Sequence, residues 1–375
     1  MKEKEAINKM YESIADELNI SDSVFESINK SYKALGEYIE NNLTGKKVSI
    51  FPQGSLNLGT LIKPISDEDE YDLDAVCKIY DSFDNPKELK QLIGTILKNS
   101  NRYSKMLQPE GKRCWTLKYS DESHFHMDIL PSCPNNEIDH SLKITHKENG
   151  KYEYRISNPE GYADWFDKLQ EVERKKIYKT RSVNYSNKVE DLRKYNVRTT
   201  LQKTIQILKR HRDMKYYDAS DEKRENKPIS IIITTLVARM YNGSENIVEL
   251  IEKFTRDWKN YIDIDSEGNY VIKNPVNEDE NFADKWVIYP ERKQAFFDWV
   301  DDLKKDLITN NYLLIDGLVE QSDYLKGIFG TSTINKVFEN QGKTKPKLYV
   351  KPGIVATLTE EKTDIEVKKH NFYGK

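Results

Sequence analysis

Two aspartates separated by one leucine, Asp72 and Asp74, interrupt an otherwise apolar segment. The alternating character of residues 70–80 predicts a β-strand. Side chains two residues apart on a strand project from the same face, so the two carboxylates lie side by side and repel each other. A strand that keeps such a pair needs a cation between the carboxylates. The pair therefore favours a sheet-containing fold with a metal site on one of its strands.

A third carboxylate, Asp128, stands in a second predicted strand at residues 124–130, next to Met127 and Ile129. Packed beside the first strand, it completes a cluster of three aspartates. Such a cluster suits two-metal phosphoryl transfer, in which the ions activate an attacking hydroxyl and stabilise the leaving pyrophosphate. The protein contributes mainly positioning and charge stabilisation. We expect two Mg²⁺ or Mn²⁺ ions as cofactors.

A turn of small and polar residues, Gln53-Gly54-Ser55, follows a predicted strand at residues 47–51. Gly54 has no Cβ, so the backbone can approach a ligand closely. Ser55 offers a hydroxyl and a backbone N–H at the start of a predicted short helix, where N–H groups bind phosphate oxygens. The turn residues are candidates for nucleotide binding, and the three aspartates for catalysis and metal binding.

Each of these features also has an ordinary explanation. A Gly-Ser pair is commonly a turn, an Asp-x-Asp pair a solvated strand face, and a lone aspartate a cap or an ion-pair partner. Their order and their shared strand-and-turn context favour the joint interpretation. A metal site of His124, His126 and Asp128 is an alternative. We rank it below the carboxylate cluster because His124 begins its predicted strand.

The composition narrows the class of protein. Hydrophobic residues make up 37% of the chain, enough for a substantial core. The formal net charge of −3 does not indicate stable nucleic-acid binding. The N-terminal segment lacks the apolar stretch of a secretory signal, and no run reaches the length of a membrane span. Cys77, Cys114 and Cys133 have no zinc-site spacing, so we expect reduced thiols in a cytoplasmic protein.

The two halves of the chain differ in predicted secondary structure. Two N-terminal helices, the second capped by Ser21, precede the strands and a helix at about residues 87–98. A charged stretch without clear periodicity, residues 172–195, separates this half from a helical one. The helices of the second half are predicted over residues 198–212, 229–241, 247–261, 291–307 and 322–337.

The sequence around the candidate residues resembles a known family. The segments FPQGSLNLGTLIKPISDEDEYDLDAV and HMDILPSCP resemble the DNA polymerase β-type nucleotidyltransferase superfamily. Within it they are similar to the bacterial cGAS/DncV-like nucleotidyltransferases, or CD-NTases. The helical segments TLQKTIQILKRHRD and KPISIIITTLVARMY are also similar to that family. The resemblance runs from about Phe51 to Trp286.

The resemblance implies an α+β protein with two lobes, a nucleotidyltransferase core with a mixed sheet and a helical domain like that of oligoadenylate synthases. It implies synthesis of a cyclic di- or trinucleotide second messenger from nucleoside triphosphates in CBASS anti-phage defence, with regulatory or conjugating CBASS proteins as partners. By position, Gly54 and Ser55 match the phosphate-holding turn and the three aspartates match the metal ligands. Lys209 and Ser230 match residues that contact nucleotide phosphates.

Lys209 and Ser230 fit these roles by their own surroundings as well. Lys209 lies four residues after Ile205, at the edge of the predicted buried face of its helix, where a cation needs an anion. It equally fits a solvated basic helix end, because it opens the run Lys-Arg-His-Arg. Ser230 follows Pro228 at a predicted helix start, where a hydroxyl either caps the helix or meets a phosphate.

The expected organisation is a nucleotidyltransferase core with N-terminal helices over residues 1–190, a helical domain over residues 191–340 and a tail over residues 341–375. Two alternatives stay open. One is a superfamily nucleotidyltransferase with an RNA, protein or small-molecule acceptor, although an RNA-tailing enzyme should carry a basic path. The other is an inactive nucleotide-binding scaffold, which has no need of three mutually repelling carboxylates.

Overall fold

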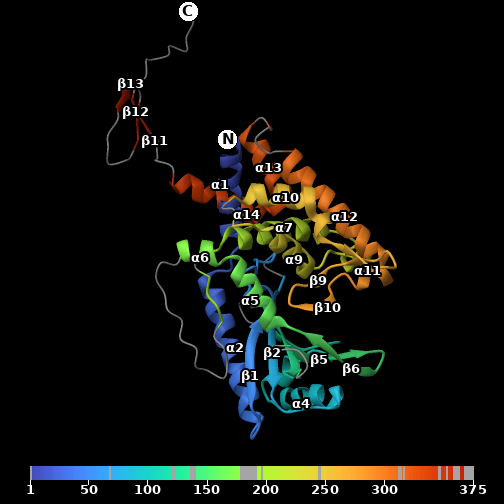
Figure 1. Ribbon diagram of the computed structural model, residues 1–375. Helices are drawn as coiled ribbons and strands as arrows, with labels where there is room; N and C mark the ends of the chain where they lie inside the picture. The colour runs from blue at the N-terminus through green and yellow to red at the C-terminus, as the bar shows by residue number, and fades with distance from the viewer. Residues whose placement is uncertain are drawn as a thin grey trace, which may run out of the picture.

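The computed structural model has a lower lobe built on a β-sheet and an upper lobe built of helices (Figure 1). The described residues are 2–66, 69–119, 124–135, 141–177, 192–195, 197–243, 246–310, 315, 317–344, 348–351, 354–357 and 364–366. The mixture of a mixed sheet with many helices confirms the predicted α+β class.

The sheet of the lower lobe has six strands in the order β1-β2-β4-β5-β6, with β3 paired to β4. The strands are β1 (Val48–Gln53), β2 (Tyr71–Ile79), β3 (Trp115–Tyr119), β4 (Phe125–Pro134), β5 (Leu142–Glu148) and β6 (Lys151–Ser157). β2 and β4 run parallel, whereas the other pairs are antiparallel. The parallel register sets Asp74 directly opposite Asp128. Two segments far apart in the sequence therefore carry carboxylates on one face.

Two helices, α2 (Asp22–Asn42) and α4 (Pro86–Lys98), pack against the other face of the sheet in one hydrophobic cluster. α2 begins as predicted, because the Ser21 hydroxyl accepts a hydrogen bond from the backbone N–H of Val24. The face that carries the aspartates has a smaller apolar cluster of its own. Its members are Phe51, Val76, Leu130, Leu142 and Ile144.

The upper lobe is arranged around α7 (Thr200–Tyr217). The longer helices that contact it are α1 (Lys2–Glu17), α9 (Ser230–Met240), α10 (Ile247–Asp257), α12 (Pro290–Lys304) and α13 (Leu318–Phe329). The apolar stripe predicted for α7 is fully buried. Since neighbours surround the helix, residues Lys209 to Arg212 are buried too. The alternative of a solvated basic helix end is therefore wrong.

Shorter elements connect and extend these parts. They are α3 (Gly54–Asn57), η1 (Tyr103–Lys105), α5 (Pro159–Leu169), α6 (Glu171–Ile177), α8 (Asp221–Glu225), η2 (Trp258–Tyr261), β7 (Asp263–Ile264), β8 (Tyr270–Val271), β9 (Lys273–Asn274), β10 (Asn277–Asn281), α11 (Lys285–Ile288), the π-helical turn η3 (Lys305–Thr309), α14 (Thr331–Thr344), β11 (Leu348–Lys351), β12 (Ile354–Thr357) and β13 (Asp364–Glu366). β7 pairs with β8, β9 pairs with β10, and β11 to β13 form a three-stranded antiparallel sheet.

The helix predicted over residues 322–337 is in fact two helices, α13 and α14. Gly330 lies between them with a φ of +92°. A left-handed residue ends an α-helix, and glycine adopts that conformation without a steric penalty. The predicted charged stretch of residues 172–195 begins inside α6, and most of it lies outside the described residues.

The N-terminal helix packs in the upper lobe. Ile14 of α1 and Leu18 just after it have no exposed surface and belong to the hydrophobic cluster around α7. α2, the next helix, packs on the sheet instead. The division at residue 190 stays a prediction, because residues 178–191 lie outside the described part of the chain.

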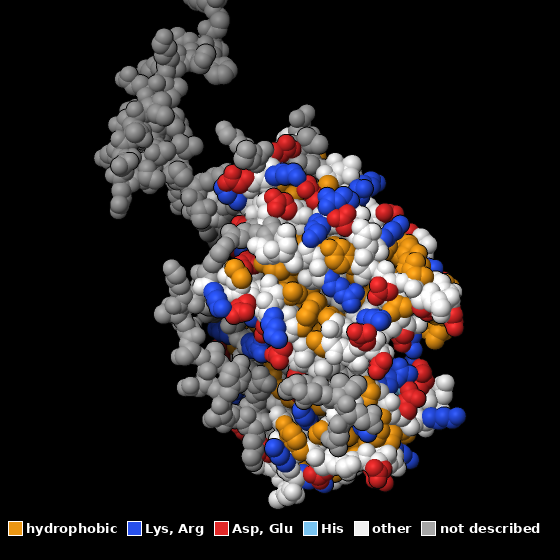
Figure 2. Space-filling model, viewed as in Figure 1, with side chains coloured by type: hydrophobic (Ala, Val, Ile, Leu, Met, Phe, Trp, Pro, Cys, Tyr) orange, Lys and Arg blue, Asp and Glu red, His pale blue; other side chains and the backbone are white. Residues whose placement is uncertain are grey.

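Charges of both signs are interspersed over the described residues of the face shown in Figure 2, in keeping with the net charge of −3. The three cysteines are free, as predicted. Among the helices that the structure describes, none combines the length and the apolar character needed to cross a bilayer.

Candidate active site

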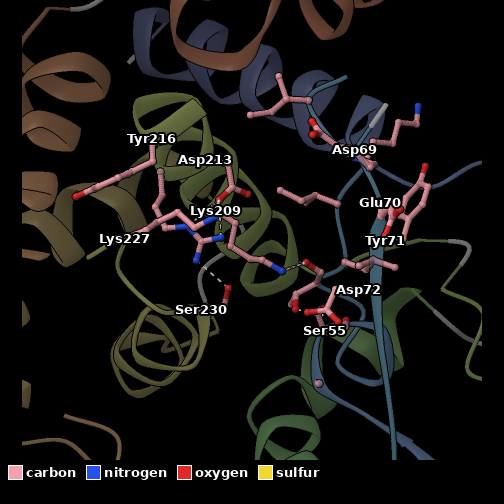
Figure 3. Close-up of a pocket in the computed structure, with 18 of the residues that line it drawn as sticks. Ser55, Asp69, Glu70, Tyr71, Asp72, Lys209, Asp213, Tyr216, Lys227 and Ser230 are labelled. Carbon is pink, nitrogen blue, oxygen red and sulfur yellow. Dashed lines mark hydrogen bonds and ion pairs between the residues drawn. The ribbon is translucent and has the colours of Figure 1, made fainter. Parts of the chain in front are cut away.

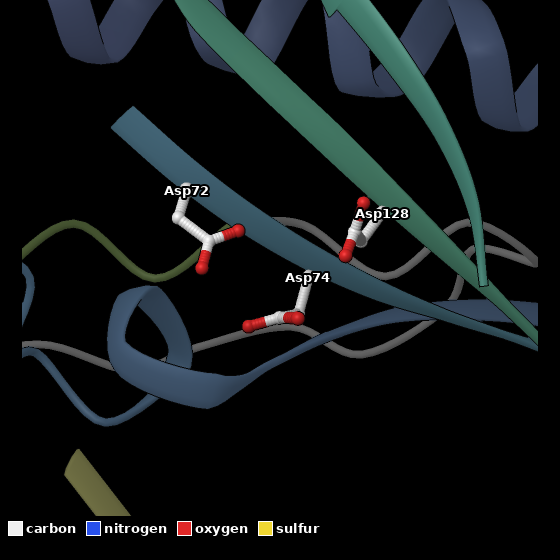
Figure 4. A group of neighbouring side chains, drawn as sticks. All are labelled: Asp72, Asp74 and Asp128. Carbon is white, nitrogen blue, oxygen red and sulfur yellow. The ribbon is translucent and has the colours of Figure 1, made fainter. Parts of the chain in front are cut away.

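Three carboxylates converge on one face of the sheet, near the starts of β2 and β4 (Figure 4). Asp72 and Asp74 lie on β2 and Asp128 on β4, and one oxygen of each lies within 4.8 Å of the others. Asp72 is exposed, whereas Asp74 and Asp128 are half-buried. Within the described ranges this is the one group of three or more side chains able to hold a metal ion. The predicted packing of the two aspartate strands is confirmed.

The charges of this cluster are unfavourable without a cation. Burial, with the charges of Asp72 and Asp128, raises the pKa of Asp74 to about 7. The ordinary value is 3.8, so the ionised form is strongly disfavoured. Hard divalent cations take carboxylate oxygens as ligands. The residues present therefore fit a divalent metal site.

Two residues orient Asp128: Thr116, which lies in β3, and Cys114, which directly precedes it. Thr116 Oγ1 donates to Asp128 Oδ1 at 2.5 Å, and Cys114 Sγ donates to Asp128 Oδ2 at 3.0 Å. Burial raises the pKa of the Cys114 thiol to about 12, which keeps it protonated as a donor. Neither residue was a candidate from the sequence. The signal in the sequence is their spacing of two, which places both side chains on one face of an extended segment.

Gly54 is the point at which the turn approaches the cluster most closely. It has a φ of +64°, and a Cβ placed on it would lie 2.3 Å from Asp74 Oδ2. The predicted close approach of the backbone is therefore present, and the neighbour is the carboxylate itself. A side chain at this position would displace Asp74.

A cleft of about 610 Å³ opens beside the cluster, between the sheet lobe and α7 (Figure 3). We call it the main cleft because both Asp72 and Asp74 line it. Ser55 and Asp72 line one side, and Lys209 extends toward them from α7. Ser230 lines the cleft at the start of α9. The structure thus brings together the candidate residues of this main cleft from both halves of the chain.

Lys209 is buried at 6% exposure, with its Nζ donating to the carbonyl of Thr60 at 2.9 Å. Burial, with the nearby charge of Arg212, lowers the pKa of Lys209 to about 8. A buried ammonium group with one backbone partner retains two donors. These donors suit an anion in the main cleft.

Lys209 belongs to a set of side chains that donate hydrogen bonds to a single stretch of backbone. All of them lie in α7 except Arg198, which shortly precedes it. Residues 58–64 have no regular secondary structure, so their buried carbonyls need partners from elsewhere. The pairs are Arg198 with Gly59, Gln202 with Leu58, Gln206 with Leu61, Lys209 with Thr60, and Arg210 with Lys63 and Pro64. We call this set the α7 clasp. It fixes the segment after the Gly-Ser turn to the helical lobe.

Ser230 has a partner that the sequence did not suggest. Arg212 Nη1 donates to Ser230 Oγ at 2.8 Å and to the carbonyl of Pro228 at 3.0 Å. The N-cap of α9 is Ile229, with no side-chain cap, so Ser230 is not the cap considered for it. Because its oxygen accepts from Arg212, its own proton is free to point elsewhere.

Gln53 lies in a second cleft of about 760 Å³ rather than in the main one. This cleft is also lined by Arg155, Asn158 and residues of the 277–285 segment. Gly54 and Asp74 line both clefts. Of the three carboxylates, Asp74 therefore lies where the two clefts meet, Asp72 lines the main cleft alone, and Asp128 lines neither.

The histidines before Asp128 have different surroundings. His126 Nε2 lies 3.0 Å from Asp72 Oδ1, and this hydrogen bond raises the pKa of His126. His124 is exposed, with a φ of +36°, and is not part of the metal-binding group. The structure thus favours the carboxylate cluster over the histidine alternative.

The comparisons with known proteins agree with this geometry. Residues 6–169 match the Second Messenger Oligonucleotide or Dinucleotide Synthetase domain. A c-di-GMP synthase of Roseivirga ehrenbergii is 30% identical over 375 residues, which cover 96% of this chain and 95% of that protein.

Solved structures share the fold. The Bradyrhizobium diazoefficiens CD-NTase CdnG in complex with GTP matches with a TM-score of 0.68 at 19% identity, over 90% of this chain and 99% of that one. CdnC of E. coli MS115-1 with ATP gives a TM-score of 0.61 at 18% identity, over 87% and 98%. GTP-bound DncV of Vibrio cholerae gives 0.54 at 14% identity, over 88% and 89%.

Identity at this level along nearly the whole of both chains, with the synthetase domain and the shared fold, shows common descent rather than a local motif. The chain belongs to the CD-NTase family and is a nucleotidyltransferase that synthesises cyclic oligonucleotides.

Proposed function

We propose that this enzyme joins two molecules of GTP into a cyclic dinucleotide, with Asp72, Asp74 and Asp128 holding two Mg²⁺ or Mn²⁺ ions. The observation that carries the proposal is the convergence of the three carboxylates around Asp74, which lines both clefts. The choice of guanine is supported by the relative named as a c-di-GMP synthase.

Divalent ions at this cluster supply an activated hydroxyl nucleophile and charge stabilisation for the leaving pyrophosphate. The chain's own contribution is to hold the three carboxylates in place. Thr116 and Cys114 fix Asp128 by hydrogen bonds to its two oxygens. Asp74 occupies the space left by the absent side chain of Gly54. Carboxylates fixed in this way need little reorganisation during the reaction.

The triphosphate binds in the main cleft in this proposal. Ser55 offers its hydroxyl and backbone N–H from the sheet side, and Lys209 offers a buried ammonium group from α7. Ser230 donates its hydroxyl proton, since Arg212 already occupies its oxygen as a donor. Positive and polar donors from two lobes then orient one anion between them.

The second nucleotide binds in the second cleft. Cyclisation requires each nucleotide's hydroxyl to attack the other's phosphate, so two nucleotides must reach one set of carboxylates. The two clefts share Gly54 and Asp74, and each is large enough to be a ligand site. Gln53 belongs to this second site, where its side chain is available to the acceptor nucleotide.

The product is proposed to act as a second messenger in CBASS anti-phage defence in the cytoplasm. A regulatory protein partner is also proposed, because E. coli CdnC has been solved in a complex with a HORMA protein. We also propose a nucleotidyltransferase core over residues 1–190, a helical domain over residues 191–340 and a tail over residues 341–375, with α1 of the first segment packed on the helical domain.

The proposal is tested by incubating the purified protein with all four labelled nucleoside triphosphates and Mg²⁺ or Mn²⁺. After phosphatase treatment, the resistant product is identified by mass spectrometry. We expect a cyclic dinucleotide that contains only guanosine. Asp74→Asn serves as the control because it removes one charge and keeps the shape, and we expect it to make no product.

The outcomes separate the parts of the proposal. A cyclic product with another base would overturn the guanine assignment and leave the carboxylate assignment intact. Full activity of Asp74→Asn would overturn the carboxylate assignment. A linear extension of an added RNA, with no cyclic product, would favour the alternative acceptor.

A further inference from the structure

A row of charged and polar side chains crosses three strands at the level of Asp72. In the sheet register His126 of β4 lies opposite Asp72 of β2 and also opposite Lys118 of β3. Side chains opposite each other on neighbouring strands share a face and contact one another. The row therefore lies on the face that carries the carboxylate cluster.

The contacts along this row are continuous. His126 Nε2 lies 3.0 Å from Asp72 Oδ1, and His126 Nδ1 lies 3.5 Å from Glu70 Oε2. Glu70 Oε1 is in turn 2.5 Å from Lys118 Nζ. Glu70 and Asp72 both border the main cleft (Figure 3). The imidazole is thus fixed between two carboxylates, with a lysine anchoring the outer one.

Asp72 needs such a partner more than the other two aspartates. Its side chain is 64% exposed, so solvent leaves it free to change rotamer. Asp128 is held by Thr116 and Cys114, and Asp74 is enclosed by the turn at Gly54. For Asp72 the hydrogen bond from His126 is the corresponding restraint, and it engages one of the two carboxylate oxygens.

We propose that His126 is a positioning residue that donates from Nε2 to Asp72 and so prepares the carboxylate cluster for its divalent ions. The inference rests on the proposed function only in taking the three aspartates as metal ligands. Glu70 and Lys118 act through His126 by fixing the orientation of its ring. Partners of this kind commonly change metal affinity by 10–100-fold when they are removed.

The test is direct binding of Mn²⁺ to the nucleotide-free protein, measured by calorimetry and by electron paramagnetic resonance. We expect His126→Ala to weaken Mn²⁺ binding by about 10–100-fold. His126→Gln should retain most of the affinity, because its amide nitrogen replaces Nε2 as a donor to Asp72. Glu70→Gln should weaken binding in the same direction but less.

The control variant is His124→Asn. His124 lies two residues before His126 and directly precedes β4. His124 is exposed with a φ of +36°, and asparagine tolerates that left-handed conformation. We expect it to bind Mn²⁺ as the wild type does. Thermal melting of all four variants checks that each is folded, so that a change in Mn²⁺ affinity is not read from an unfolded protein.

Two results would overturn the inference. Wild-type Mn²⁺ affinity in His126→Ala would show that Asp72 needs no such restraint. Strong hyperfine coupling of bound Mn²⁺ to a directly coordinated imidazole nitrogen would make His126 a metal ligand instead. If the wild type bound no Mn²⁺, the assignment of the aspartates as metal ligands would be overturned. The positioning role of His126, which rests on that assignment, would be overturned with it.

Discussion

At the scale of single residues, the site depends on what stands next to each aspartate. Gly54 leaves room for Asp74, while Thr116 and Cys114 hold Asp128 by hydrogen bonds. These neighbours influence catalysis by positioning the aspartates, without contacting a nucleotide themselves. Substitutions at such positions are therefore expected to change activity more than stability.

We predict that Gly54→Ala lowers activity by about 100-fold, the effect expected of a displacement of about 1 Å at a catalytic group. The added Cβ would lie 2.3 Å from Asp74 Oδ2, so the carboxylate must move. Gly45→Ala is the matched control, because Gly45 also has a left-handed φ but no atom within 4 Å of its added Cβ. Cyclic product formation is measured for both variants.

Both variants should lose about 1–2 kcal/mol of stability, since each forces alanine into a left-handed conformation. Only Gly54→Ala should lose activity. Equal activities of the two variants would mean that the close approach to Asp74 has no catalytic consequence.

The raised pKa of Asp74 predicts a pH dependence of stability. The pKa is about 7 in the folded protein and 3.8 for an unperturbed aspartate. The folded state therefore binds more protons than the unfolded state between these values. The contribution of Asp74 is fully present below about pH 4 and is lost as the pH rises through 7.

Thermal melting of the metal-free wild type and of Asp74→Asn checks this dependence. The melting temperature of the wild type minus that of the variant should fall as the pH rises from 4 to 8. Adding Mg²⁺ at pH 8 should stabilise the wild type more than the variant. A difference that stays constant with pH would contradict the prediction.

At the scale of elements, α7 joins the two lobes through polar groups. The α7 clasp satisfies the buried carbonyls of residues 58–64, which follow the Gly-Ser turn. Its members recur about once per turn of the helix, so one face of α7 matches one length of backbone. The clasp therefore places Lys209 and the turn in a fixed relation.

Gln206→Met tests the clasp. Gln206 is fully buried and its Nε2 donates to Leu61 at 2.9 Å and to Asn19 Oδ1 at 3.0 Å. Methionine has a similar shape and no donor, so we expect a loss of about 1–3 kcal/mol in the free energy of unfolding. Gln294→Met, at an exposed position of α12, should change it by less than about 0.5 kcal/mol. Urea unfolding followed by circular dichroism measures both.

At the scale of the whole molecule, the first helix of the chain completes the core of the upper lobe. Ile14 of α1 has no exposed surface and packs in the hydrophobic cluster around α7. The chain then crosses to the sheet lobe with α2 and returns with α7. The helical lobe is therefore built from the first helix of the chain together with the helices from α7 onward.

We expect Ile14→Ala to lower the free energy of unfolding by about 2–5 kcal/mol through the cavity that it leaves. Ile264→Ala is the matched control, because Ile264 is 63% exposed, and it should change stability by less than about 0.5 kcal/mol. Denaturant unfolding compares the two. Similar small effects would show that α1 is not part of the cooperative core.

The sequence by itself determined the local structure and the chemistry of the metal-binding residues. Periodicity predicted α2 with its Ser21 cap, the buried stripe of α7, and the strands that carry the aspartates. Carboxylates in apolar strands are identifiable because their cost is local: it depends on the residue and its immediate neighbours along the chain.

Only the tertiary structure decided which residues meet. The parallel pairing of β2 with β4 set Asp74 opposite Asp128, and no period in either strand specifies its partner or register. The burial of Lys209 and Arg212 and the turn of His126 toward Asp72 likewise arose from contacts with distant segments. A polar side chain has the same local pattern whether water or another part of the chain satisfies it, and only the packed fold distinguishes the two.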